Sequence, residues 1–291
     1  MSLIGLWITR VGDNLKTAVL FAGHLRTFEK CYENHLHHIV EKNDVDLFFY
    51  TSKQDSHKIL THSSGKRSRR KEKPNAIRSL HIYQNSDKKI DKLHELYEPY
   101  IKAVYFEDEE YDYAGNEYKP PRKIEQYSRK DWNYFRTTQF KKVYYGFKEI
   151  EQYAENNNIQ YDYFIRMRPD MTFSRQRART KGYDIDINSL MASHDGCKNT
   201  VWVFGGWPVS KRFMSEGKAL YDGFALGSFE NMRNYCSLYE RRSKKIKGPF
   251  TPENQLALHL KEHGIKIRYL NRDWKRYYKK SLGRGYRLVR E

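Results

Sequence analysis

The stretch YDYFIRMRPDMTF, residues 161–173, decides how the rest of the chain is interpreted. It begins as a run of aromatic and aliphatic residues, which is typical of a buried strand. It then places Arg166, Arg168 and Asp170 at alternate positions, with Pro169 before the carboxylate. Because side chains alternate along a strand, we expect all three to point to one face. Strand pairing should stop at the proline, which has no amide hydrogen to donate.

The residues before this stretch alternate between strand and helix patterns. Apolar runs at 17–23 and 45–52 predict buried strands, and the helical spacing at 24–40 predicts a helix between them. This order predicts a parallel strand–helix–strand unit. The patterns that follow predict a mobile loop at 53–78, a strand at 79–85, a helix at 88–101, a strand at 102–108, an acidic loop at 107–118 and a long helix at 131–155.

The residues after the stretch predict a less regular second half. The predicted elements are a strand at 200–208, a helix from 228 to about 241, a helix at 251–265 and a strand at 266–270. The predicted fold class is α/β, with a mostly parallel central sheet that is flanked by helices.

Composition limits the partners and the compartment. The chain has 291 residues and a formal net charge of +18, which favours anionic partners: nucleic acid, an anionic membrane surface or a phosphorylated small molecule. Basic residues gather at 66–73 and in the tail at 266–291. The three cysteines lack a metal-binding spacing, and no apolar run approaches the roughly 20 residues of a membrane span. We therefore expect a cytoplasmic protein, with peripheral membrane association left open.

The end of the 161–173 strand carries the chemistry. In open α/β sheets, ligands bind at the carboxyl ends of strands. Arginine side chains match phosphate oxygens, and an aspartate beside them can bind a divalent cation or accept a hydrogen bond from a sugar hydroxyl. The alternative is an internal Arg–Asp salt bridge that fixes a turn.

Four stretches, in this order, resemble nucleotide-sugar-dependent glycosyltransferases of GT-A-like fold. The resemblance is to the group that carries R-x-R-P-D in place of Asp-x-Asp and occurs in polysaccharide gene clusters and large DNA viruses. The stretches are AVLFAGHLRTFEKC (18–31), the helix around Gln139 with FIRMRPDMTF (164–173), YDGFALGSFENM (221–232) and TPENQLALHL (251–260). The resemblance implies one domain over 1–291: a nucleotide-sugar-binding half at about 17–173, an acceptor-side half at about 174–265 and a basic tail at 266–291.

The resemblance also implies roles for single residues. A nucleotide-diphosphate sugar would be the donor substrate and a glycan the acceptor. Mn²⁺ or Mg²⁺ would bind at Asp170, although a single aspartate also fits a metal-independent enzyme. The implied catalytic residues are Asp170, Asp222 and Glu253, and the implied donor-binding residues are Gly23, His24, Arg26, Gln139, Arg166, Arg168 and Asp170.

Other interpretations stay open at this point. Glu253 lies in the first turn of a helix, where any acidic residue complements the dipole, and Asp222 is followed by glycine, as in a turn. Arg26 could be a surface residue of its helix. The tail at 268–290 interleaves aromatic and basic residues, which suits a non-catalytic protein that binds single-stranded nucleic acid. Motifs for dinucleotide, P-loop, hydrolase and zinc sites are absent from the sequence.

Overall fold

The computed structural model describes residues 15–52, 54–60, 79–85, 87–107, 129–173, 187, 199–208, 218–243, 252–270 and 286–288. The basic cluster at 66–73, most of the acidic segment at 107–118 and most of the tail lie outside these ranges.

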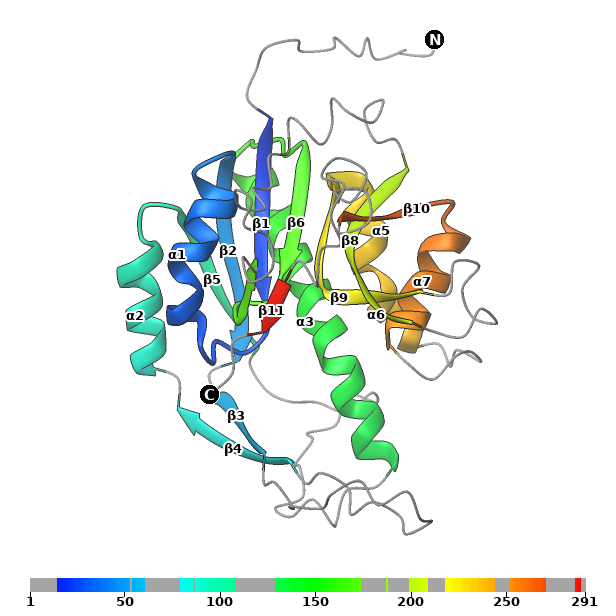
Figure 1. Ribbon diagram of the computed structural model, residues 1–291. Coiled ribbons are helices and arrows are strands. Elements are labelled where there is room, and N and C mark those ends of the chain that lie inside the picture. Colours follow the sequence, from blue (N-terminus) through cyan, green and yellow to red (C-terminus); the bar gives the residue numbers. More distant parts are fainter. Residues whose placement is uncertain are drawn as a thin grey trace, which may run out of the picture.

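A seven-stranded sheet forms the centre of the molecule (Figure 1). Its strand β1 (Lys16–Ala22) pairs in parallel with β2 (Asp44–Ser52) on one side and with β6 (Tyr163–Met167) on the other. β5 (Ile101–Glu107) lies outside β2, and beyond β6 follow β9 (Lys218–Ser228), β8 (Thr200–Pro208) and β10 (Lys266–Tyr269). Of these seven strands, β9 alone is antiparallel to the others. The predicted α/β class with a mostly parallel sheet is confirmed.

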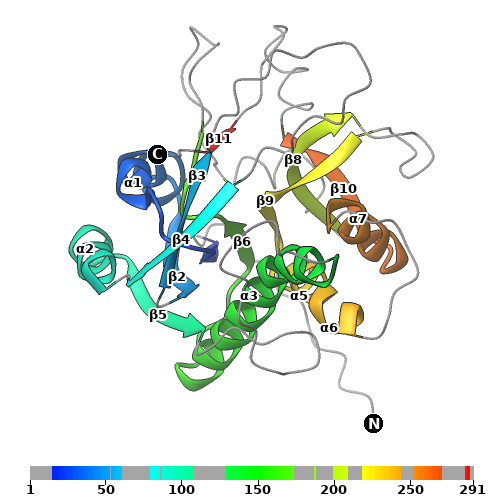
Figure 2. The same ribbon diagram turned by 90° about the horizontal axis from the view of Figure 1, so that it is seen from below.

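Helices cover both faces of the sheet (Figure 2). One face carries α1 (Tyr32–His35) and α2 (Asp87–Tyr97), and we call it the α1 face. The other carries α3 (Arg129–Asn156), α5 (Phe229–Cys236), α6 (Leu238–Ser243) and α7 (Pro252–Glu262), and we call it the α3 face. Alternate residues of the buried strands feed two separate hydrophobic clusters, one under each face.

The segment predicted as one helix at 24–40 is shorter and mixed in type. It consists of a 3₁₀ turn η1 (Phe28–Cys31), the single turn α1 and a π turn η2 (Leu36–Val40). The helical part begins late because Gly23 has a φ of 143° and Arg26 a φ of 44°, and a right-handed helix cannot contain such residues.

Part of the predicted mobile loop at 53–78 is a strand. β3 (Gln54–Leu60) pairs with β4 (Ser79–Asn85), and the two form an antiparallel ribbon apart from the main sheet. Its sequence has no strong apolar alternation, as expected for a ribbon that is not part of the main sheet. The prediction of a structureless loop is therefore wrong for 54–60.

In the second half, the predicted helix from 228 to about 241 is divided between α5 and α6 at Ser237. Ser228 caps α5, because its side-chain oxygen accepts a hydrogen bond from the backbone nitrogen of Asn231 at 3.2 Å. The predicted helix and strand near the end correspond to α7 and β10.

Helix α3 lies unusually close to the sheet. A Cβ added to Gly146 would lie 2.9 Å from Leu20 Cδ1 and 2.9 Å from Tyr50 Cβ, so only glycine fits between the helix and strands β1 and β2. None of the helices in the described part of the chain has the length and apolar character to cross a bilayer.

Candidate functional site

The chain changes direction across the sheet at β1. From β1 it proceeds outward to β2 and β5, and it then returns to place β6 on the opposite side of β1. In open α/β sheets this reversal opens a crevice at the carboxyl ends of the two strands, where ligands bind. Gly23 to Arg26 follow β1 at that edge, and Arg168 to Asp170 follow β6.

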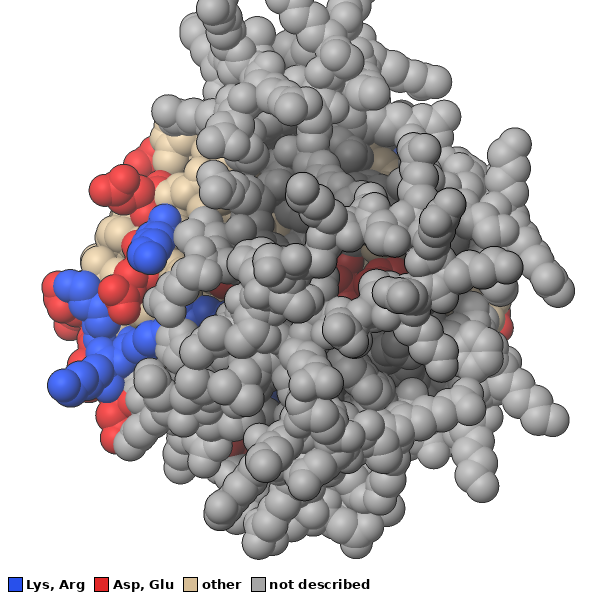
Figure 3. Space-filling model, turned by 60° about the horizontal axis from the view of Figure 1, so that its bottom comes forward, with Lys and Arg blue, Asp and Glu red and all other residues tan. Residues whose placement is uncertain are grey.

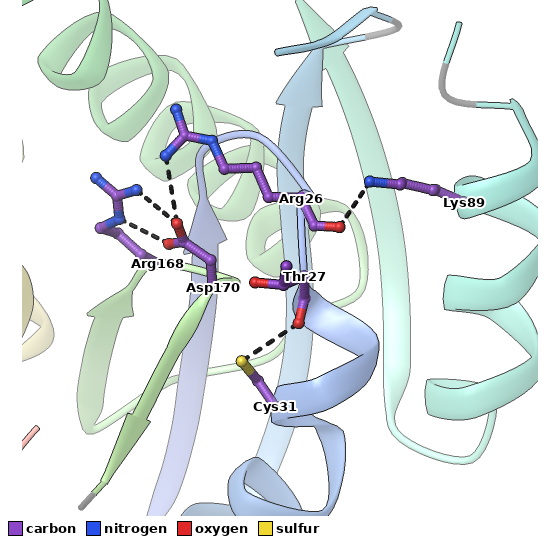
Figure 4. Close-up of polar contacts among 6 residues, drawn as sticks. All are labelled: Arg26, Thr27, Cys31, Lys89, Arg168 and Asp170. Atoms are coloured by element: carbon purple, nitrogen blue, oxygen red, sulfur yellow. Dashed lines mark hydrogen bonds and ion pairs between the residues drawn. The ribbon is translucent and has the colours of Figure 1, made fainter. Parts of the chain in front are cut away.

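Asp170 joins these two loops (Figure 4). Arg168 donates from Nε to Oδ1 and from Nη2 to Oδ2 of Asp170, both at 2.8 Å. Arg26 reaches the same Oδ2 from Nη1 at 3.3 Å. Asp170 is 0% exposed, whereas the side chains of Arg168 and Arg26 are 25% and 22% exposed. The carboxylate is therefore enclosed, and the two guanidinium groups are partly exposed at this edge of the sheet.

The charge of Asp170 is strongly stabilised. Burial by itself raises the pKa of this carboxyl, but Arg168 and then Arg26 outweigh burial and lower the pKa to about 2. The internal salt bridge considered above is thus present. It also holds two cationic side chains in place at the edge where an anionic ligand would bind.

The backbone of Arg26 is held from a neighbouring helix. Nζ of Lys89, on α2, donates to the carbonyl oxygen of Arg26 at 2.6 Å (Figure 4). Next along the chain, Sγ of Cys31 donates to the carbonyl oxygen of Thr27 at 3.4 Å. A non-glycine residue with positive φ is costly and persists where its surroundings fix it, which happens often at binding sites. Lys89 supplies such a contact, and nothing in its sequence context indicated it.

The short strand β7 (Met171–Phe173) follows Asp170 directly and is hydrogen-bonded to α1. His35 is fully buried and donates from Nε2 to the carbonyl oxygen of Met171 at 2.6 Å, so its Nδ1 accepts from the Tyr97 hydroxyl at 2.7 Å. Burial lowers the pKa of His35 to about 4, so the ring is neutral in this role. Beside β7 lies β11 (Tyr286–Leu288), which belongs to the tail.

The prediction that Arg166, Arg168 and Asp170 share one face is wrong. β6 ends at Met167, as expected from Pro169, and the alternation of side chains ends with it. Asp170 adds to the raised pKa of Cys31, whose main cause is burial, so the carboxylate lies toward the α1 face. Arg166 points to the α3 face, as Phe164 does.

The other predicted site residues are distributed as follows. Gly23 lies close to the turn at Pro169, since a Cβ on it would lie 3.5 Å from Cδ of that proline. Its backbone nitrogen donates to the carbonyl oxygen of Tyr50 at 3.1 Å. His24 is half-buried in the same loop. Gln139 lies on α3, and its side chain is outside the described part. Asp222 lies on β9. Glu253 lies in the first turn of α7, which packs on β9 and β10.

A second polar cluster lies at the carboxyl ends of β2 and β5. Glu107 contacts Lys142 and lies 3.1 Å from Nζ of Lys141, and Lys142 donates to Oγ of Ser52 at 2.6 Å. Glu107, Lys142 and Ser52 are buried, and burial lowers the pKa of Lys142 to about 7. Residue 107 lies in both the predicted strand at 102–108 and the predicted acidic loop at 107–118, and in the structure Glu107 is the buried last residue of β5.

The described residues do not by themselves provide a metal site. Among them, no three His, Cys, Asp or Glu side chains gather closely enough to hold an ion. Both oxygens of Asp170 already accept hydrogen bonds from guanidinium groups, which would compete with a Mn²⁺ or Mg²⁺ ion for this carboxylate.

The surface at this edge does not form one basic patch over the described residues. Figure 3 brings the carboxyl edge of the sheet forward, and on its left acidic and basic side chains intermix. Helix α2, on that side in Figure 1, contributes exposed residues of both signs: Asp87, Lys88, Asp91 and Glu95.

Among known proteins, the similarity is to solved structures. No protein-family model matches the chain, and no curated protein matches it. Among solved structures, it is similar to core-mannan synthase A (CmsA/Ktr4) from Aspergillus fumigatus in its Mn/GDP form. The TM-score is 0.48 and the sequence identity 9%, over 90% of this chain and 74% of that chain. At this identity and TM-score the similarity assigns neither a family nor an activity.

Proposed function

We propose that the chain is a glycosyltransferase that moves a hexosyl or pentosyl group from a nucleotide-diphosphate sugar to a glycan acceptor. The observation that carries this proposal is the position of Arg26 and Arg168. They lie at the switch point of the sheet, partly exposed, and are fixed by one enclosed carboxylate. Such an arrangement suits a ligand with several phosphate oxygens.

The donor diphosphate would lie against Arg26 and Arg168. Both guanidinium groups are partly exposed at this edge, so phosphate oxygens could approach them there. Gly23 and His24 would line the crevice beside the nucleotide, because they belong to the loop that carries Arg26, and Gln139 would approach from α3. Arg166 is left out of this set because it points to the other face of the sheet.

Asp170 would act as a positioning residue. It keeps the two guanidinium groups at a fixed spacing, so their charge is already in place when the diphosphate becomes the leaving group. Preorganised positive charge of this kind stabilises the departing diphosphate. Metal dependence is one arm of the test.

The transfer also requires a base for the acceptor hydroxyl. Asp222 is our first candidate, because β9 pairs with β6 and the backbone nitrogen of Arg168 donates to the carbonyl oxygen of Gly223, next to Asp222, at 3.0 Å. Glu253 is the second candidate. Its helix packs on β9, one strand further from the crevice than β6.

A ligand panel tests the proposal. Unfolding temperatures would be measured with each nucleoside diphosphate and nucleotide sugar, with and without Mn²⁺ or Mg²⁺. A ligand at 100 times its dissociation constant should add about 2.7 kcal/mol to the free energy of unfolding. We expect one nucleoside diphosphate to stabilise the wild type and to lose most of that effect with Arg168→Met. Arg233→Met, an exposed arginine of α5, serves as the charge-matched control.

The same panel includes the competing function. Stabilisation by single-stranded oligonucleotides, with no response to any nucleotide, would reject the transferase and favour a nucleic-acid-binding protein. A cytoplasmic location and a glycan as partner remain part of the proposal.

A further inference from the structure

Arg166 is a buried arginine on the opposite face of the sheet from the Asp170 carboxylate. The residue is 2% exposed. Phe164, two positions earlier on β6, packs in the core of the α3 face, whereas Ile165 and Met167 pack in the core of the α1 face. The guanidinium of Arg166 therefore lies under α5 and not in the crevice beside Arg26.

The groups nearest to this charge come from the second half of the chain. Burial raises the pKa of the Tyr235 phenol, the Arg166 charge lowers it, and the Asp222 carboxylate raises it. Burial also raises the pKa of the Cys236 thiol, and Arg166 lowers it. The packing agrees with these influences, because Arg166 pairs with Ala225 of β9 and α5 packs on both β6 and β9.

Arg166 has donors without acceptors. Within the described part of the chain, neither Nε nor Nη1 of Arg166 has a hydrogen-bond partner, and the buried hydroxyl of Tyr235 has none either. Unpaired donors on a buried guanidinium are costly even where a carboxylate such as that of Asp222 lies nearby, because they have lost their hydrogen bonds to water. Nε and Nη1 of Arg166 therefore contribute no stabilising hydrogen bond to the fold.

We propose that Arg166 and Tyr235 form a subsite for an anionic group, a carboxylate or a phosphate, on the acceptor sugar. An oxyanion offers acceptors to the guanidinium and the phenol together, and hydrogen bonds between charged groups are the strong ones. The inference rests on the proposed function, in which Asp222, beside this subsite, accepts the proton from the acceptor hydroxyl. The acceptor is then an acidic sugar, and its anionic group is bound separately from the donor diphosphate.

The test compares charged and neutral sugars of one size. Dissociation constants of methyl β-glucuronide, glucose 6-phosphate and methyl β-glucoside would be measured for the wild type, Arg166→Met, Tyr235→Phe and Arg233→Met. We expect the wild type to bind one anionic sugar at least about tenfold more tightly than the neutral glucoside. Whichever anionic sugar binds identifies the group as carboxylate or phosphate. Arg166→Met should remove the preference, Tyr235→Phe should weaken it, and Arg233→Met should keep it.

Stability supplies a second, independent readout. We expect Arg166→Met to unfold at the same temperature as the wild type or higher. A lower unfolding temperature with unchanged sugar binding would show that Arg166 serves the fold, and this would overturn the proposal. The absence of any preference for anionic sugars in the wild type would overturn it too. Stabilisation by a nucleoside diphosphate is measured separately, so the donor site can stand or fall independently of this subsite.

Discussion

Arg168 donates hydrogen bonds to both carboxylate oxygens of Asp170 in a bidentate salt bridge, although the residues are only two positions apart. Pro169 between them ends the strand and turns the chain, so the arginine can fold back over the aspartate. The same contact stabilises the turn and fixes the orientation of the Arg168 guanidinium. Loss of the carboxylate should therefore affect both stability and ligand binding.

Asp170→Asn should lower the free energy of unfolding at neutral pH by about 2 kcal/mol, because the folded state lowers the carboxyl pKa from 3.8 to about 2. The depressed pKa means that this stabilisation is present above pH 4 and is lost as the pH falls toward 2. Denaturant titrations from pH 2 to 7 should show this slope in the wild type and not in the variant. Asp162→Asn, an exposed residue at the other end of β6, is the control. Equal acid sensitivity of wild type and Asp170→Asn would contradict the assignment.

Lys89→Met should weaken binding of the stabilising nucleoside diphosphate by about tenfold, because the carbonyl oxygen of Arg26 loses a charged hydrogen bond. Titration calorimetry would measure the dissociation constant. Lys92→Met, on the same helix and paired with Glu95, should leave it unchanged. If both variants bind alike, the contact from α2 does not position Arg26.

Glu107→Gln should extend the pH dependence of stability to lower pH. Burial already lowers the pKa of Lys142 to about 7, and removal of the carboxylate lowers it further. An unfolded lysine binds its proton up to about pH 10.4, so the free energy of unfolding should rise between pH 7 and 10 in the wild type, and in the variant the rise should begin below pH 7. Denaturant midpoints at several pH values check this, and the double variant with Lys142→Met should remove the slope. A slope that persists in the double variant would assign it to another group.

Gly146→Ala should destabilise the protein by about 1–3 kcal/mol, since the added methyl group overlaps Leu20 and Tyr50. In an exposed helix the same change would stabilise by roughly 0.5–1 kcal/mol. Thermal unfolding measures the effect, with Gln152→Ala on the exposed side of α3 as the control. An unfolding temperature at or above that of the wild type would mean that α3 can move away from the sheet.

The predictable part of the fold was the part with strong local periodicity. β1, β2 and α3 have clear apolar patterns, and the structure places them within one or two residues of the predicted bounds. β9 was not assigned, because its sequence LYDGFALGS carries two glycines and no regular alternation.

Only those site residues that lie at the ends of predicted strands could be found from the sequence. Arg168 and Asp170 stood out because they end an apolar strand, and Arg26 because it follows one. Glu107 and Lys142 could not be found in this way. Glu107 opens a run of acidic residues and Lys142 follows another lysine, so each has the sequence context of an exposed residue. Their burial is set by the packing of α3 on β2 and β5, which no local pattern encodes.

The contact between Arg26 and Asp170 joins residues that are 144 positions apart in the chain. Contacts of such long range form late and slowly when a protein folds, because the intervening chain must first be brought together. The β1–β2 unit can assemble from neighbouring segments, whereas the crevice exists only after β6 has docked beside β1. During refolding, helical circular dichroism should therefore recover before the ability to bind a nucleotide, and the interval between them reports the docking of β6.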